Sequence, residues 1–338
     1  QACPRARTAL KFLVEDGRLE VIASGSLLGI HFKEDVPSHP VGYEHRLDMH
    51  SLDFEEFLWA MGIGESTIEQ VRINFENRTA VDSYIHKRLL ELFQRYMIVG
   101  GMPRVVDIYT KDQNIQDVII EQRNIVGGYK DDILKYAGNL QLEVAKVFDS
   151  IPDHLMERNK RFIMAHVEKN ARFRDFKDAL AWLRSARVAE FCFNVSAPII
   201  PMGLNAKNNI FKFFMRDTGL LCQMSLGNVQ QAILAGDLEV NLGSIIENTI
   251  ADLLVKRGHK LYYYDVKGRL EIDFLITRDF KILPIEVKGG KDFRNHHSLD
   301  RLLENPVFSI DEGIVLCRGN VEQDGRVFYL PLYMVMFL

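Results

Sequence analysis

The sequence has 338 residues, of which 47% are hydrophobic and 26% charged, and this balance excludes a disordered, collagen-like or coiled-coil chain. Its 42 Lys and Arg residues against 46 Asp and Glu residues give a net charge of −4, so a surface that binds nucleic acid must arise from local segregation of charge. The four cysteines are far apart and form no C-x-x-C pair, which favours reduced thiols in a cytoplasmic protein over disulfides or a zinc site. No uncharged stretch is long enough to cross a bilayer, so we expect no membrane partner.

The pattern of the first part, residues 1–148, predicts mainly helices. The glycine pair in Gly100-Gly101-Met102-Pro103 is a helix breaker in the middle of this region. The expected elements are helices over 7–15, 53–61 and 66–100, a helical block up to about residue 148, and one short strand over 19–23.

The second part, residues 149–228, predicts the order helix, helix, strand, with helices over 155–167 and around 176–183 and a strand over 189–195. Between residues 157 and 187, nine basic residues face four acidic ones, which gives this segment a net charge of +5. A solvated helical face is the ordinary explanation of such a run. The order of elements favours a winged-helix-like unit that touches DNA, with Arg172, Arg174 and Lys177 as the residues expected to bind it.

The third part, residues 229–338, predicts the order α-β-β-β-α-β. The expected elements are a helix over 244–257, strands over 261–264, 270–277 and 282–288, a helix over 296–304 and a strand over 313–317. The apolar end of the chain, 327–338, is expected to form a strand, and His296 and His297 are expected to be exposed.

Two of these strands carry acidic and basic residues at alternating positions. Alternation places Ile272, Phe274 and Ile276 on one face of their strand, and Glu271 and Asp273 on the other. On the next strand, Leu283, Ile285 and Val287 share one face and Glu286 and Lys288 the other. A turn centred on Asp279-Phe280 pairs Asp273 with Glu286, which places their Cβ atoms about 5 Å apart on one face.

Two carboxylates at that distance repel each other unless a cation lies between them. We therefore expect Asp273 and Glu286 to bind Mg²⁺, helped by Glu247 on the preceding helix, where a buried carboxylate needs a partner. Lys288 would orient water or stabilise charge on a phosphate, so the expected catalytic residues are Asp273, Glu286 and Lys288. The alternative is an edge hairpin in which Lys288 merely pairs with Glu271 or Glu286.

Five segments in this order resemble a known family, the predicted prokaryotic ATPases of the AAA type that are fused to a C-terminal domain of unknown function. That domain has a restriction-endonuclease-like, PD-(D/E)xK fold. The resemblance rests on Val21 to Leu28 (VIASGSLL), Leu52 to Leu58 (LDFEEFL), Gly100 to Val106 (GGMPRVV), Asp217 to Leu221 (DTGLL), and Glu247 with EIDF at 271–274 and EVK at 286–288.

The resemblance implies an α/β multidomain protein with an AAA-type ATPase remnant and helical lid, a winged-helix-like middle and a nuclease-like C-terminal domain. It also implies that Ser24 and Ser26 sense the γ-phosphate of ATP and that Arg46 contacts phosphate. The chain contains no G-x-x-x-x-G-K-[ST] loop, so we expect ATP to bind the longer parent protein and not this chain, which we interpret as truncated before the sensor strand.

The expected function is that of a fragment of an ATP-binding protein whose nuclease-like domain binds Mg²⁺ and DNA. A non-catalytic module of the same fold, serving as a DNA- or protein-binding platform in a nucleotide-driven switch, is the alternative. The sequence leaves open whether the chain forms a homo-oligomer.

Overall fold

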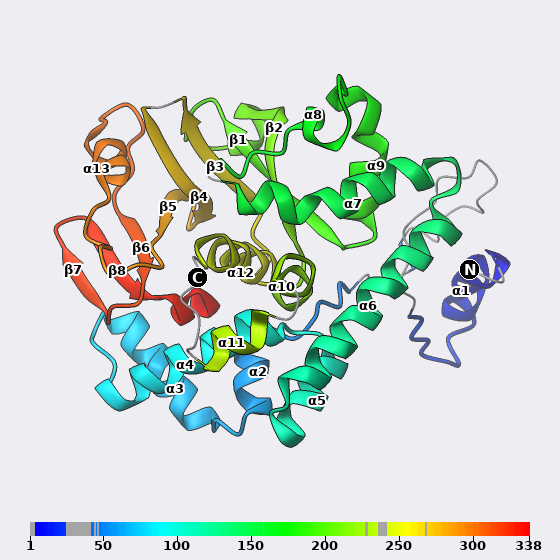
Figure 1. Ribbon diagram of the computed structural model, residues 1–338, viewed down its shortest axis with the longest axis horizontal. Helices are drawn as coiled ribbons and strands as arrows, with labels where there is room; N and C mark the ends of the chain where they lie inside the picture. Colours follow the sequence, from blue (N-terminus) through cyan, green and yellow to red (C-terminus); the bar gives the residue numbers. More distant parts are fainter. Residues whose placement is uncertain are drawn as a thin grey trace.

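The computed structural model describes residues 4–24, 42–43, 45, 47–157, 159–226, 229–235, 242–267 and 269–338. These residues form a mixed α/β arrangement in which helices and one large sheet surround a central helix (Figure 1). None of the helices in the described ranges combines the length and the apolar character that a bilayer crossing requires.

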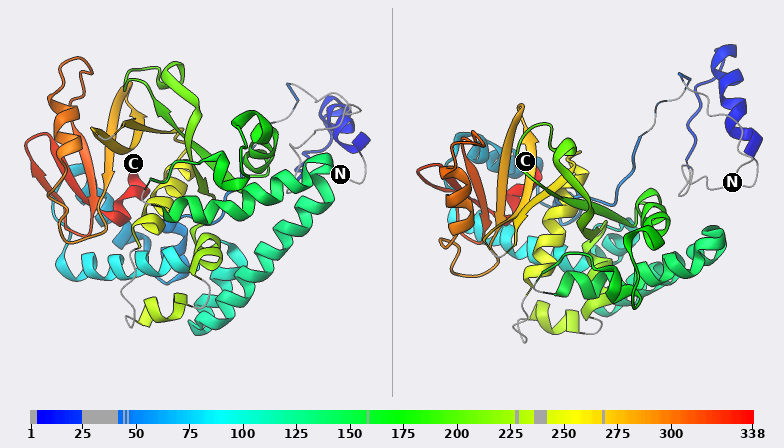
Figure 2. Two further views of the ribbon diagram at one scale, coloured as in Figure 1. Left: turned by 45° about the horizontal axis from the view of Figure 1, so that its top comes forward. Right: turned by 90° about the horizontal axis from the view of Figure 1, so that it is seen from above.

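The N-terminal helix α1 (Pro4–Asp16) stands apart from the rest of the described chain (Figure 2, right). The strand expected over 19–23 is wrong, because these residues are exposed and have no strand partner among the described residues. An extended segment without a neighbour has no ladder hydrogen bonds to make it a strand.

The next five helices begin in the lower part of the molecule in Figure 1, and the last of them runs from there up the right-hand side. They are α2 (Phe54–Ala60), α3 (Glu65–Asn77), α4 (Ser83–Val99), α5 (Pro103–Asp112) and α6 (Ile115–Tyr136). A capping box begins α2, since Asp53 accepts from the Glu56 amide and Glu56 accepts from the Asp53 amide. The helix expected over 66–100 is two helices, because the chain turns at Arg78, whose φ is +56°. Gly100, at φ +77°, ends α4 as expected.

The middle of the chain continues with helices and a hairpin. Its elements are a 3-10 turn (Gly138–Leu140), α7 (Gln141–Met156), α8 (Met164–Val167), α9 (Phe173–Ser185), β1 (Ala189–Val195), a second 3-10 turn (Met202–Asn205), β2 (Ala206–Met215), α10 (Thr218–Leu226) and α11 (Gln230–Ala235). The helix expected over 155–167 is wrong, since α7 ends at Met156 and only the last turn, α8, is helical.

The last part has the predicted order of elements. It consists of α12 (Gly243–Lys256), β3 (Leu261–Val266), β4 (Leu270–Arg278), β5 (Lys281–Val287), α13 (His297–Glu304), β6 (Gly313–Cys317), β7 (Glu322–Asp324), β8 (Val327–Pro331) and a 3-10 helix (Leu332–Phe337). The strand expected at the apolar end therefore stops at Pro331, and the final residues form a buried 3-10 helix.

The eight strands of the described ranges belong to one sheet in the order β2-β1-β3-β4-β5-β6-β8-β7. Within it, β1 pairs with β2 antiparallel and with β3 parallel. The sheet therefore runs across the expected boundary between residues 228 and 229, and the middle and C-terminal parts share it.

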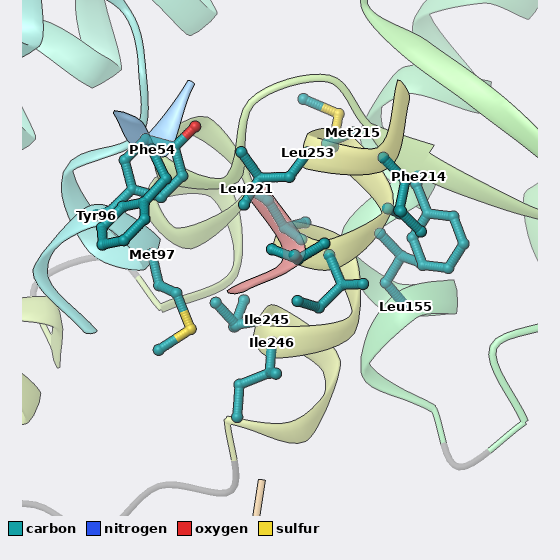
Figure 3. Packing of buried hydrophobic residues seen from close by; sticks show 14 of the residues in the cluster. Phe54, Tyr96, Met97, Leu155, Phe214, Met215, Leu221, Ile245, Ile246 and Leu253 are labelled. Atoms are coloured by element: carbon teal, nitrogen blue, oxygen red, sulfur yellow. The ribbon is translucent and has the colours of Figure 1, made fainter. Parts of the chain in front are cut away.

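Helix α12 lies at the centre of the hydrophobic core, and each residue from Ile245 to Leu254 is buried. Figure 3 shows Ile245, Ile246 and Leu253 of α12 in this core, together with Phe54, Tyr96 and Met97 of the N-terminal helices and Leu155, Phe214 and Met215 of α7 and β2. Side chains from all three parts of the chain therefore pack on α12, and a second, smaller cluster of buried residues lies beneath α13. The three cysteines within the described ranges, Cys192, Cys222 and Cys317, are free and buried.

Candidate nuclease-like site

The hairpin of β4 and β5 has the predicted register. Its ladder runs from Arg278 opposite Lys281 to Phe274 opposite Ile285, and it ends one residue before Asp273 and Glu286. The turn lies at Asp279 and Phe280, as expected, and both residues have positive φ, 49° and 60°. Two left-handed residues in succession define the turn whose twist matches a two-residue hairpin, so the local backbone sets the register.

Strand β5 alternates as predicted. Leu283, Ile285 and Val287 pack with the core around α12, whereas Glu286 and Lys288 form an ion pair on the other face, with Nζ 2.7 Å from Oε1. Glu286 is buried, at 7% exposure, and its other oxygen, Oε2, has no hydrogen-bond partner among the residues that the structure describes. A buried carboxylate oxygen without a partner costs free energy unless a ligand satisfies it.

Strand β4 departs from the predicted alternation. The register with β3 shifts by one residue between the pairs Tyr262–Leu275 and Tyr264–Ile272, so β4 contains an extra residue there. Ile272 accordingly packs with the core beneath α13, whereas Phe274 and Ile276 pack in the core around α12. The prediction that these three share one face is therefore wrong.

Asp273 and Phe274 are the β4 residues between these two pairs. The Asp273 carboxylate accepts a hydrogen bond from the Val287 amide, with Oδ2 2.8 Å from the nitrogen. This hydrogen bond connects the Asp273 side chain to β5 just beyond the last residue pair of the β4–β5 ladder. Its other oxygen, Oδ1, accepts no hydrogen bond from the described part of the chain.

Glu247 of α12 is buried, and two lysines neutralise it. Lys212 of β2 binds its Oε1 at 2.9 Å, and Lys160, in the segment between α7 and α8, binds its Oε2. Lys212 also lies 3.4 Å from an oxygen of Glu271. We expected a metal ion to offset the cost of burying the Glu247 carboxylate. In the structure two lysine ammonium groups offset it instead. Within the described ranges, no group of three or more His, Cys, Asp or Glu side chains is close enough together to hold a metal ion.

Burial and neighbouring charges shift the pKa values of the three carboxylates of the site. Burial, together with the charges of Glu247 and Glu286, raises the pKa of Asp273 to about 7, although Lys212 opposes this shift. Burial also raises the pKa of Glu286, against the effect of Lys288. For Glu247 burial acts in the same direction, but Lys212 and Lys160 outweigh it and lower its pKa. Asp273 is thus electrostatically linked to both of the other carboxylates.

Sequence reasoning missed His296. We expected it to be exposed, but it is buried, and its ring nitrogens contact Asp300 Oδ1 at 2.9 Å and the Tyr329 hydroxyl at 2.6 Å. It also contributes to the field at Glu286. The four-residue spacing of His296 and Asp300 could have indicated their contact on one helix. The contact with Tyr329 depends on the tertiary fold and has no local sequence pattern.

The other predicted residues are not part of this cluster in the described structure. Ser24 is exposed, and Ser26 and Arg46 lie outside the described residues. Arg172, Arg174 and Lys177 are exposed at the beginning of α9. The expected DNA-binding residues are therefore accessible to a partner.

Comparison with known families identifies two domains in this mixed α/β protein. Residues 90–231 match the domain of unknown function DUF8612, and residues 242–335 match the domain of unknown function DUF4143. DUF4143 is often associated with proteins similar to AAA-type ATPases. The expected C-terminal domain of unknown function is thus confirmed.

Two further comparisons concern individual proteins. A search of curated proteins gave no match. Among solved structures, the chain is similar to the crystal structure of protein VC1899 from Vibrio cholerae, with 11% identity and a TM-score of 0.19. The match covers 65% of this chain and 54% of that one, so the chain spans about half the length of that protein.

Proposed function

We propose that the C-terminal part of this chain is a Mg²⁺-dependent nuclease-like domain that acts on DNA, within a protein related to AAA-type ATPases. The observation that carries the proposal is the buried Oε2 of Glu286, which has no hydrogen-bond partner among the described residues. Oε1 of the same carboxylate is ion-paired with Lys288, and the charge of Glu286 acts on Asp273. The order of α12, β3, β4, β5, α13 and β6 supports it as well, because this is the order expected from the resemblance.

The residues fit Mg²⁺ through two carboxylates. Mg²⁺ keeps several waters and is commonly bound by one or two carboxylates together with substrate phosphates. Oδ1 of Asp273 and Oε2 of Glu286 are the oxygens available for it, since Oδ2 of Asp273 accepts from Val287 and Oε1 of Glu286 binds Lys288. Glu247, whose two oxygens are engaged by lysines, is not needed for this pair to bind the ion.

The protein's own groups have distinct roles in the proposal. Bound Mg²⁺ would polarise a phosphodiester and lower the pKa of a coordinated water. Asp273 and Glu286 hold the negative charge that attracts the ion, and the hydrogen bond from Val287 fixes the orientation of Asp273. Lys288, 30% exposed, presents its ammonium to the attacked phosphate, where it stabilises the developing charge. Arg172, Arg174 and Lys177 would bind the DNA backbone away from the reacting phosphate.

The proposal is tested by DNA cleavage in the presence of Mg²⁺ or Mn²⁺. Replacement of Asp273 by Asn should abolish cleavage, whereas Lys288→Met should lower kcat and leave cation binding in place. Asp279→Asn is the matched control, because Asp279 is an exposed acid in the turn of the same hairpin and Asn tolerates its positive φ. Cleavage that survives both Asp273→Asn and Lys288→Met would show that the activity does not arise at this site.

A second function, a non-catalytic binding platform, is favoured by the pairing of charges within the site. Glu247 has two lysine partners and Glu286 has one, so much of the acidic charge is balanced without a cation. In that case the domain binds DNA or protein as part of a nucleotide-driven switch, and ATP acts on the longer protein. DNA binding with the same affinity in EDTA and in Mg²⁺, without cleavage, is the result that selects this alternative.

A further inference from the structure

The loop that connects β1 to β2, residues 196–205, presents apolar side chains to solvent. Leu204 is 84% exposed, Ile199 43% and Ile200 40%, and the loop contains no charged residue. Single apolar residues scattered over a surface need no explanation, whereas exposed apolar residues that gather at one place mark an interaction site. We call these three residues, which lie within one short loop, the apolar tip.

The loop is ordered by its own contacts. The Ser196 amide donates to the Asn205 carbonyl oxygen at 2.8 Å, and the side-chain amide of Asn205 donates to the Ile199 carbonyl oxygen at 3.2 Å. Met202 is buried in the core cluster beneath α13, at 3% exposure, and anchors the loop there. Because the backbone is already fixed, the apolar tip loses little conformational entropy when it makes a contact.

The beginning of α9 packs against the same hairpin, close to the loop. The ring centres of Phe173, in the first turn of α9, and Phe211 of β2 are 5.8 Å apart, and Phe211 pairs with Phe193 of β1. The pairing of the two strands ends two residues further along β1, at Val195, which is about 7 Å along the strand. The loop begins at the next residue. The exposed arginines of the proposed DNA contact precede and follow Phe173 in the chain, so the cations and the apolar tip lie at the same end of the hairpin.

This combination favours DNA as the partner of the apolar tip. The basic segment 157–187, with its net charge of +5, complements the phosphates that border a groove of the duplex. Proteins that bind the minor groove insert Leu, Ile or Pro side chains between base steps, which unstacks the bases and kinks the duplex. A loop without charged residues suits such insertion, because no ion has to leave water. A protein groove would use the apolar tip alone and would leave the cations of α9 without a role.

We propose that the apolar tip is a wedge that enters the minor groove of duplex DNA and kinks it, while the basic residues at the beginning of α9 bind the adjacent phosphates. The inference rests on the DNA-binding part of the proposed function and requires no divalent cation. It also gives the chain a preference among DNA sequences. Flexible pyrimidine–purine steps kink at the lowest cost and are therefore the preferred sites.

The test measures binding and bending of a short fluorescent duplex by the full chain in EDTA, where cleavage does not interfere. Anisotropy gives the affinity, and energy transfer between dyes at the two ends of the duplex reports the bend. Leu204→Ser combined with Ile200→Ser should weaken binding by about tenfold or more, the effect of removing a large apolar side chain from a buried contact, and should abolish the rise in energy transfer. The slope of log K against log [salt] should not change, because no phosphate contact is lost. Leu134→Ser is the matched control, since Leu134 is an exposed leucine of α6, and it should bind and bend DNA like the unaltered chain.

Equal affinity and equal bending by the tip variant and the unaltered chain would overturn the inference. If binding is then still weakened by charge reversal at Arg172, Arg174 and Lys177, the DNA-binding function stands and only the wedge is lost. Absence of duplex binding by the unaltered chain would remove both. Sedimentation velocity without DNA tests a different occupant: self-association that Leu204→Ser abolishes would show that the apolar tip contacts a second copy of the chain, and this result would also overturn the wedge.

Discussion

The carboxylate of Asp217 accepts a hydrogen bond from the amide of Gly101, with 2.8 Å between oxygen and nitrogen. Asp217 also accepts from the Leu220 amide, so it joins the DTGLL segment to the GGMP segment. The two segments pack without space for a side chain: a Cβ on Gly219 would lie 2.3 Å from the Val99 carbonyl oxygen. These two of the five segments that support the family resemblance therefore act here in packing between the N-terminal helices and α10.

Replacement of Gly101 by Ala should destabilise the protein strongly. The added Cβ would lie 2.0 Å from the carbonyl oxygen of Leu52, a backbone atom that cannot move aside easily. We expect a loss of about 3 kcal/mol or more in the free energy of unfolding, in the range of severe overpacking. Asp217→Ala should cost about 1–3 kcal/mol because it leaves two amides unpaired. Urea denaturation measures both. Gly127→Ala is the control, because nothing lies within 4 Å of the added Cβ and Ala favours a helix over Gly, so this change should not lower the stability.

The Lys212–Glu247 pair should be worth far more than a surface ion pair. Both side chains are at 4% exposure or less, so Lys212→Met leaves a buried carboxylate with Lys160 alone and should cost about 3–5 kcal/mol. The double variant Lys212→Met with Glu247→Met should regain much of this loss. Lys146→Met, which breaks an exposed pair with Glu168, should change the stability by less than about 1 kcal/mol. Equal losses in Lys146→Met and Lys212→Met would contradict this account of the buried pair.

Asp273 should destabilise the protein at high pH when no divalent cation is present. Folding raises its pKa from 3.8 to about 7, so the folded state holds the proton more tightly than the unfolded chain does. The stability gained from that proton is complete below pH 4 and is lost as the pH rises from about 4 to about 7. Asp273→Asn, which can still accept from Val287, should therefore exceed the unaltered protein in stability at pH 8 by on the order of 4 kcal/mol, since one pKa unit is about 1.4 kcal/mol and the pKa of Asp273 rises from 3.8 to about 7.

This pH dependence is measured by thermal unfolding in EDTA between pH 4 and pH 8. The melting temperatures of the two proteins should converge toward pH 4. Asp279→Asn, in the exposed turn, should follow the unaltered protein throughout. A constant difference between Asp273→Asn and the unaltered protein across the range would show that the effect is not due to ionisation of Asp273.

DNA binding should depend steeply on salt through the beginning of α9. Arg172, Arg174 and Lys177 are exposed there, and each phosphate contact that is lost reduces the slope of log K against log [salt] by about 0.9. Charge reversal of all three should flatten the slope by about 2–3, as measured by fluorescence anisotropy at several salt concentrations. Charge reversal at Arg104 and Lys111, exposed on α5, should leave it unchanged. A salt slope that does not change after charge reversal on α9 would show that DNA binds elsewhere.

The sequence predicted the hairpin of the candidate site well because its geometry is local. The turn at Asp279-Phe280 sets the register, and alternation along β5 then places Glu286 and Lys288 together. The extra residue near Asp273 was not predictable, since it depends on how β4 pairs with β3. Local pattern carries no information about such a shift.

The partners of Glu247 and His296 were missed for a different reason. Lys160 and Lys212 are 87 and 35 residues away from Glu247 in the chain, and Tyr329 is 33 residues away from His296. These contacts form because one sheet includes strands from β2 to β8. The sequence indicated that these strands belong to two separate units, 149–228 and 229–338. The buried state of Glu247 was foreseen, but its counter-ions come from the tertiary fold.

Calorimetric titration of Mn²⁺ into the full chain at pH 7.5, compared with Asp273→Asn, Glu286→Gln and the control Asp279→Asn, tests the proposed cation site most directly. We expect one ion to bind the unaltered chain and the control with equal affinity, and at least tenfold weaker binding in each of the other two variants. Equal binding by all four proteins, or binding by none, would contradict a divalent-cation site formed by Asp273 and Glu286.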